Sequence, residues 1–281
     1  MPTHHSDDAK IATDVASSYL LADPVAHNLV LTLLQQRIAH PEPGHYWWVT
    51  EADRTVGFAM QSPRDFHAGV VPTTPAVVDQ LAERMHEDVP HLPGVSGEAA
   101  TAARLAGRWT ELAGAAARPV EAQRLYVLDT VTAPVPSGRR IRPAVDGDLD
   151  LVVQWAEGFV ADTGLVHPGD LRSTVAAMVT TGRVFLLESD GRPVSMARAS
   201  EPVAKVCRIG WVYTPPELRA RGLATELVAT LSARELAAGS ERCTLYTQLA
   251  NPTSNGIYRA IGYRAVAEIM TYAFGPPDTR S

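Results

Sequence analysis

Two stretches of the chain show the pattern of a β-hairpin, in which strand-like runs of apolar residues flank a short polar turn. The four strand segments are Tyr46–Thr50, Thr55–Met60, Arg183–Glu188 and Pro193–Arg198. When Val56 is set against Val194, the two hairpins are 138 residues apart (194 − 56 = 138). This spacing predicts that one fold occurs twice in the chain.

The most regular helical pattern covers Leu223–Ala237, where Leu223 and Leu227 fall on one face of the expected helix. Gly239 follows, in a position that favours a left-handed cap. The residues before this helix, Val206–Tyr213, are strand-like. This half therefore predicts a strand that leads through a turn into a long helix.

Each half predicts the same order of elements: a helix, a hairpin, a strand, a long helix, a strand, a short helix and a final strand. Leu105–Trp109 resembles Ala260–Arg264, and both precede a strand-like segment. Prolines, a glycine and small polar residues predict a linker at 131–138. The predicted domains are 1–130 and 139–281, in keeping with about 150 residues per domain.

Composition narrows the class of protein. The net charge of −6 lacks the basic footprint of a nucleic-acid binder, so no nucleic-acid partner is expected. Two cysteines, Cys207 and Cys243, cannot form a disulfide framework. The longest aliphatic run, at 29–34, is far shorter than the ~20 residues that span a bilayer, and the N-terminus lacks the pattern of a signal peptide. We therefore expect a cytoplasmic protein without a membrane partner.

The segment between the predicted strand Val206–Tyr213 and the predicted helix Leu223–Ala237 has the features of an anion site. Backbone N–H groups are unpaired at a helix start, and the helix dipole places partial positive charge there. Gly222 and Ala224 allow close approach to the backbone, and Arg219 and Arg221 add charge. This combination suits a pyrophosphate. The alternative is that the glycine only eases a turn and the arginines are solvated.

Two motifs carry a resemblance to a known family. Arg219–Ala224 resembles the Arg/Gln-x-x-Gly-x-Gly/Ala signature of the Gcn5-related N-acetyltransferase (GNAT) superfamily, whose loop holds the pyrophosphate of acetyl-coenzyme A (acetyl-CoA). Asn251–Tyr263 is similar to its second motif, with asparagine and tyrosine seven residues apart. The resemblance implies an α+β fold with the mixed sheet of acyl-CoA N-acyltransferases. Residues 139–281 would form the catalytic domain of two tandem GNAT-like domains, and 1–130 its degenerate partner.

The resemblance also implies roles for single residues. Backbone groups of Val212, Tyr213 and Thr214 would bind the pantetheine arm, and the Val212 N–H would polarise the thioester carbonyl. Tyr258 would protonate the departing thiolate; its alternative role is core packing with the hydroxyl at the rim. The other cofactor-binding residues implied are Arg219, Ala220, Arg221, Gly222, Leu223, Ala224, Thr225, Asn251 and Ser254.

Other segments of the chain give weaker indications of a functional site. Residues 70–81 match the position of the loop in the first half but have neither glycine nor arginine, so that half is expected to be non-catalytic. His86–His91 has one residue too many for a zinc-protease motif, and Pro90 interrupts the helix it needs. No metal site is predicted. Candidate general bases are Glu157, Asp162, His167, Glu188 and Glu201.

The implied function is transfer of an acetyl group from acetyl-CoA to a primary amine by direct attack in a ternary complex. The acceptor is a small-molecule amine or a peptide, and exposed sheet edges allow a homodimer. Two alternatives stay open: thiol-cofactor biosynthesis resembling mycothiol synthase, and a non-catalytic acyl-CoA sensor or scaffold. Tyr258 favours an enzyme, because a binding module needs no acid for a thiolate.

Overall fold

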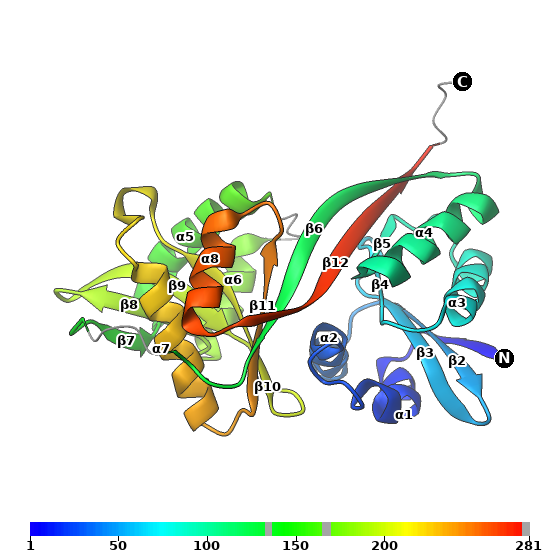
Figure 1. Ribbon diagram of the computed structural model, residues 1–281, viewed down its shortest axis with the longest axis horizontal. Coiled ribbons are helices and arrows are strands. Elements are labelled where there is room, and N and C mark those ends of the chain that lie inside the picture. The colour runs from blue at the N-terminus through cyan, green and yellow to red at the C-terminus, as the bar shows by residue number, and fades with distance from the viewer. Residues whose placement is uncertain (133–136, 165–169, 277–281) are drawn as a thin grey trace. The chain divides into compact units, whose positions relative to one another are not determined.

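Two units, each with a mixed β-sheet and covering helices, make up the fold in the computed structural model (Figure 1). The structure describes residues 1–132, 137–164 and 170–276, so positions 133–136 of the predicted linker lie outside it. Unit 1 comprises Met1–Leu125, Thr247–Ala250 and the residues from Val266 on. Unit 2 comprises Tyr126–Tyr246 and Asn251–Ala265.

Unit 1 has the sheet order β1-β2-β3-β4-β5-β12. All neighbouring strands in it are antiparallel except β4 and β5, which are parallel and are connected through α3. Its elements are β1 (Thr3–Ser6), α1 (Ala9–Leu20), α2 (Asn28–Ala39), β2 (His45–Glu51), β3 (Arg54–Gln61), β4 (Ala68–Val70), α3 (Pro75–Asp88), β5 (Gly94–Glu98), α4 (Ala99–Ala113), most of β6 (Ala116–Leu128) and most of β12 (Arg264–Gly275).

Unit 2 has the sheet order β6-β11-β10-β9-β8-β7, in which only the residues of β6 from Tyr126 on belong to this unit. The strands from β7 to β10 are antiparallel neighbours, and β10 and β11 are parallel and connected through α7. Its elements are β7 (Arg140–Pro143), η1 (Asp146–Asp148), α5 (Leu149–Thr163), α6 (Leu171–Thr180), β8 (Val184–Ser189), β9 (Arg192–Ala199), β10 (Val206–Tyr213), η2 (Pro216–Leu218), α7 (Leu223–Ala237), β11 (Arg242–Gln248) and α8 (Pro252–Ile261).

The repeat predicted from the hairpins is confirmed. Strand β3 begins at Arg54 and β9 at Arg192, an offset of 138 residues (192 − 54). One detail of the repeat was wrong. Gly107 was matched to Gly262, yet Gly107 lies inside α4, whereas Gly262 adopts a left-handed conformation at the end of α8. The corresponding glycine of α4 is Gly114, which ends that helix with φ 62°.

The last strand, β12, does not follow the predicted division, in which residues 139–281 form one domain. Residues of β12 from Ile269 to Ala273 pair antiparallel with β5, and Phe274 stacks on Trp109 with ring centroids 5.3 Å apart. These contacts place the residues from Val266 on in unit 1. Hydrophobic periodicity identifies such a strand but does not identify its neighbour.

Alternating side chains of β8 supply two separate cores in unit 2. Phe185 and Leu187 are buried with α7 and α8, whereas Val184 and Leu186 are buried with α5 and α6. This division follows from the two-residue period of a strand whose faces are both covered. Figure 1 shows the two helix pairs on opposite sides of this sheet.

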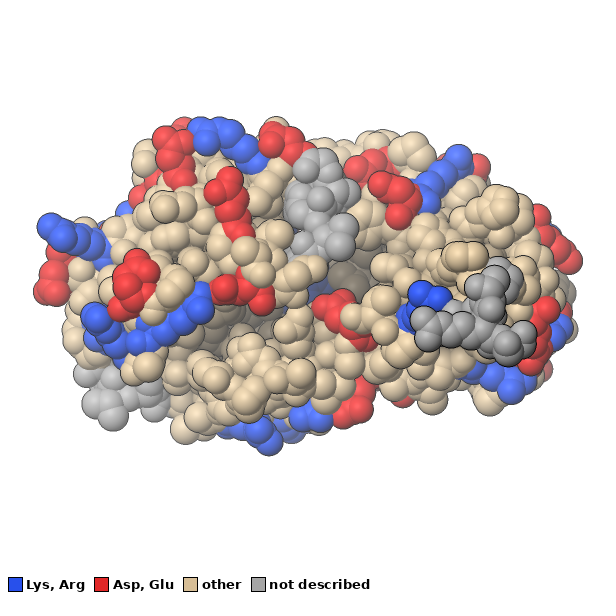
Figure 2. All heavy atoms as spheres, turned by 90° about the horizontal axis from the view of Figure 1, so that it is seen from above, with Lys and Arg blue, Asp and Glu red and all other residues tan. Residues whose placement is uncertain are grey.

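On the face shown in Figure 2, acidic and basic side chains are interspersed. Among the described residues, no helix has both the length and the apolar character needed to cross a membrane. Cys207 and Cys243 are buried free thiols, and burial raises the pKa of each.

Candidate functional site

Strand β10 is irregular where the pantetheine-binding residues are expected. Its register with β9 shifts between Gly210 and Tyr213, and Trp211 has φ 53°, which is uncommon for a bulky residue. An extra residue of this kind is a β-bulge, and bulges re-aim the groups around them. Val212 therefore follows a bend in the strand and lies outside the regular ladder with β9.

The other side of β10 is only partly paired. Its parallel register with β11 covers Val206–Arg208 and Arg242–Thr244, although β10 continues to Tyr213. An extended ligand can join a sheet as an added strand only where a strand edge is not already paired. The last part of β10 meets this condition, and it contains Val212 and Tyr213.

Side chains from neighbouring elements fix the end of β10. The Ser195 hydroxyl lies 2.8 Å from the Tyr213 carbonyl oxygen, to which it donates, and 2.9 Å from Thr214 Oγ1. Arg219 donates from Nε to the Thr214 carbonyl at 2.9 Å. The Tyr213 ring rests on α5 at Gly158, where a Cβ would lie 2.3 Å from the Tyr213 hydroxyl oxygen. The strand end is thus held on three sides.

The loop after β10 presents backbone N–H groups. Ala220 and Gly222 have φ of 61° and 73°, and Gly222 is the N-cap of α7. The first helical hydrogen bond runs from the Glu226 N–H to the Gly222 carbonyl at 3.0 Å. Within the described chain, the N–H groups of residues 220–225 donate to no acceptor. An anion at this helix start would find donors already in place.

The arginines of the loop are engaged with the protein. Arg219 forms an ion pair with Asp162 of α5 and lies over the Tyr213 ring, 5.7 Å from its centroid. Arg221 donates to the Glu217 carbonyl at 3.1 Å. The sequence analysis missed Arg139, which pairs with Glu226 in the first turn of α7 at 2.6 Å. Nothing in the spacing marks Arg139, because it precedes the helix by more than eighty residues.

Two of the expected cofactor contacts lie at the start of α8. Asn251 is its N-cap, and the Asn251 Oδ1 accepts the Ser254 N–H at 2.9 Å. The cap accounts for the asparagine without a ligand. Asn255, one turn on, is buried and accepts a hydrogen bond from the Tyr126 hydroxyl at 2.8 Å.

Tyr258 packs in the core of unit 2, and its role as an acid stays a prediction. Its side chain is 7% exposed, and its ring lies 6.3 Å from that of Tyr126 and 6.0 Å from that of Tyr263. Its hydroxyl makes no hydrogen bond to any described residue, yet it is not among the fully enclosed polar atoms. Burial raises the pKa of Tyr258 to about 12, so the hydroxyl keeps its proton at neutral pH.

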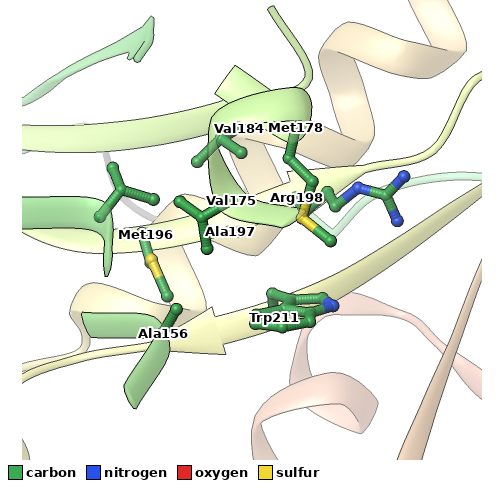
Figure 3. A pocket seen from close by; sticks show the side chains of 9 residues that line it. Ala156, Val175, Met178, Val184, Met196, Ala197, Arg198 and Trp211 are labelled. Carbon is green, nitrogen blue, oxygen red and sulfur yellow. The ribbon is translucent and has the colours of Figure 1, made fainter. Parts of the chain in front are cut away.

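A small, largely apolar cavity lies beside the bulge of β10 (Figure 3). It is lined by Val152, Ala156, Val175, Met178, Val184, Met196, Ala197, Arg198 and Trp211. The Arg198 Nε is enclosed and has no hydrogen-bond partner among the described residues. Burial, together with Arg208 and Arg183, lowers the pKa of Arg198 to about 10, so the guanidinium stays charged at neutral pH.

The described candidate bases all lie outside the cavity lining. Asp162 pairs with Arg219, Glu188 with Arg142 at 2.6 Å, and Glu201 lies 3.7 Å from Arg183. The fourth, Glu157, is exposed. His167 lies outside the described residues. Among the described residues that line the cavity, none has a carboxylate or an imidazole.

Comparison with known proteins gives one family. Residues 155–263 match the acetyltransferase (GNAT) family. A search of curated proteins found no match.

Solved structures similar to the whole chain include members of the same family. A GNAT acetyltransferase from Colwellia psychrerythraea is 10% identical with a TM-score of 0.63, and the match covers 98% of this chain and 100% of that one. A Drosophila protein is 15% identical with a TM-score of 0.70, over 98% and 99%. A tandem GNAT protein from the clavulanic acid biosynthesis pathway is 13% identical with a TM-score of 0.57, over all of both chains. At these identities the likeness shows the fold, which is a tandem arrangement.

Proposed function

We propose that unit 2 transfers an acetyl group from acetyl-CoA to a primary amine, because residues 155–263 match the acetyltransferase (GNAT) family. The observation that carries this proposal is the row of N–H groups at residues 220–225, which have no acceptor in the described chain and lie directly after the part-paired end of β10. A pyrophosphate and an extended arm attached to it require this sequence of features.

The cofactor-binding residues follow from this placement. The N–H groups of Ala220 to Thr225 would hold the pyrophosphate, with Arg221 adding positive charge nearby. Backbone groups of Val212, Tyr213 and Thr214 would hold the pantetheine arm. Ser254 follows Asn251 at the start of α8 and would lie on the far side of the cofactor.

Two groups of the chain would then act on the reacting atoms. The thioester supplies the acetyl group, and its carbonyl oxygen would receive a hydrogen bond from the Val212 N–H, which stabilises the negative charge that develops there. As the neutral amine attacks the carbonyl carbon and the C–S bond breaks, the Tyr258 hydroxyl would donate to the leaving sulfur. The amine nitrogen would release its proton to water, and water would return a proton to the Tyr258 oxygen.

The Tyr258 hydroxyl separates this proposal from one of its two alternatives. A non-catalytic acyl-CoA sensor needs the loop and the strand but has no use for a phenol that donates a proton to sulfur. A thiol-cofactor biosynthesis enzyme would use the same groups and differ only in its amine.

Release of free CoA thiol in the presence of a panel of primary amines tests the proposed reaction. We expect acetyl-CoA to give thiol release that requires an amine and yields the acetylated product, identified by mass. Binding of acetyl-CoA without turnover on any amine class would favour the sensor.

The enclosed guanidinium group of Arg198 is the basis of a prediction about the amine acceptor. The enclosed Nε of Arg198 has lost its hydration without gaining a partner, which costs folding free energy. We propose that the guanidinium pairs with an anionic group of the acceptor. In Figure 3 the guanidinium points away from the other labelled side chains. Arg198→Met should raise the free energy of unfolding by about 1 kcal/mol while it raises the acceptor KM about tenfold or more.

Thermal unfolding and steady-state kinetics with varied acceptor measure both effects. Arg192→Met, an exposed arginine at the start of the same strand, is the matched control. A fall in stability in Arg198→Met, or an unchanged KM for anionic acceptors, would remove Arg198 from acceptor binding.

A further inference from the structure

Unit 1 contains a cluster of metal-ligating side chains where the sequence predicted no metal site. His5 and Asp7 come from β1 and the residue after it, and His45 begins β2. The antiparallel register pairs His5 with Trp47 and Ser6 with Tyr46, so it brings Asp7 opposite His45. Since side chains alternate along a strand, all three lie on one face.

The three ligand atoms lie at distances suited to a single ion. His5 Nε2 is 3.1 Å from His45 Nδ1 and 3.4 Å from Asp7 Oδ1, and His45 Nδ1 is 2.9 Å from Asp7 Oδ1. A tetrahedral zinc ion with bonds of about 2.0–2.1 Å keeps its ligands about 3.3 Å apart. The observed triangle is close to one face of that tetrahedron.

Neighbouring groups orient these ligands. Asp88 Oδ2 lies 3.8 Å from His5 Nδ1, which favours a proton on Nδ1 and leaves Nε2 free to bind a metal. Arg64 holds the second oxygen of Asp7 at 3.0 Å, so Oδ1 is left toward the histidines. Trp47 packs against both imidazole rings, with centroids 5.5 and 5.6 Å away, and donates to Asp88 at 2.9 Å.

Exposure leaves room for a fourth ligand. The histidine side chains are 20% and 15% exposed, whereas that of Asp7 is 58% exposed, so one side of the triangle faces water. Two imidazoles and one carboxylate form a set that Zn²⁺ accepts with an open position.

We propose that His5, Asp7 and His45 bind a divalent transition metal ion of the zinc class, with water as the fourth ligand. The ion joins β1 to β2 through their side chains. This site lies in unit 1 and does not depend on the acetyl-transfer reaction proposed for unit 2.

Calorimetric titration of the full-length protein with Zn²⁺ tests the site, and Co²⁺ serves as a second probe because its visible absorption reports tetrahedral coordination. We expect one ion per chain, a Co²⁺ spectrum that Zn²⁺ abolishes, and a Tm that rises with Zn²⁺ concentration. Asp7→Asn and His45→Ala should each weaken binding by about tenfold or more. Because Asp7 is mostly exposed, Asp7→Asn should retain the fold.

His4→Ala is the matched control, since His4 is the adjacent histidine on β1 and contacts Thr50 and Trp48 instead. It should bind Zn²⁺ as the natural chain does. Absence of Zn²⁺ binding, or equal loss of binding in His4→Ala and Asp7→Asn, would overturn the proposal and leave a hydrogen-bonded cluster without a metal.

Discussion

Replacing Gly222 by glutamate is expected to abolish binding of acetyl-CoA, with a loss of affinity of roughly 100-fold or more. Gly222 is the exposed N-cap of α7, and no atom lies within 4 Å of the position that a Cβ would take there. The glutamate therefore has room, but its carboxylate stands among the N–H groups proposed to hold the pyrophosphate. Two like charges would then compete for one set of donors. Calorimetric titration of the variant with acetyl-CoA measures the effect.

The matched control for this variant is Gly191→Glu. Gly191 has the same φ of 73°, is also exposed, and likewise has open space within 4 Å of where a Cβ would lie, but it belongs to the β8–β9 turn. Both variants carry the same backbone cost, about 1–2 kcal/mol for a side chain in the left-handed region. If Gly191→Glu loses affinity equally, the loss comes from instability; if Gly222→Glu binds normally, the loop is not the phosphate site.

Replacing Tyr258 by phenylalanine is expected to lower kcat by about 10²–10⁴-fold with little change in the affinity for acetyl-CoA. The ring, which packs against Tyr126 and Tyr263, is kept, and only a hydroxyl without a protein partner is lost. Because the pKa of Tyr258 is raised to about 12, the hydroxyl stays protonated as pH rises through the ordinary tyrosine value near 10. If kcat of the natural enzyme falls as the pH is raised toward 10, another group causes that fall, and Tyr258→Phe should show it too.

Tyr263→Phe separates catalysis from packing. Tyr263 is equally buried, but its hydroxyl is hydrogen-bonded to the Ser232 hydroxyl at 2.8 Å. That variant should lose about 1 kcal/mol of stability and keep its kcat. Full activity in Tyr258→Phe, measured by thiol release with a saturating amine, would remove the tyrosine from the mechanism.

The sequence predicted the helices and hairpins whose residue patterns lie within a short stretch of the chain. The helix expected at Leu223–Ala237 begins and ends at those residues, because its apolar face and the glycines near both ends are encoded within it. The hairpins and their offset of 138 residues were also confirmed. The resemblance to GNAT acetyltransferases rests on two local motifs, Arg219–Ala224 and Asn251–Tyr263, in the second half of the chain.

Features that depend on strand register could not be predicted in the same way. The bulge at Trp211 is a backbone conformation with no residue signature, since neither glycine nor asparagine occupies it. The pairing of β12 with β5 joins residues about 175 apart, as Thr271 and Ser96 show. The cluster of His5, Asp7 and His45 could not be predicted without the register of β1 and β2, because its three ligands come from these two strands. Arg198 looks like any strand arginine until its burial is known.

The number of acetyl-CoA molecules bound per chain tests the central claim most directly. The loop of unit 2 offers free N–H groups after a glycine N-cap, whereas α3 of unit 1 begins at Pro75 with no arginine or glycine beside it. Calorimetric titration of the natural full-length chain with acetyl-CoA should therefore give a stoichiometry of one. Two molecules per chain would show that unit 1 also binds the cofactor, and none would contradict the assignment of the loop.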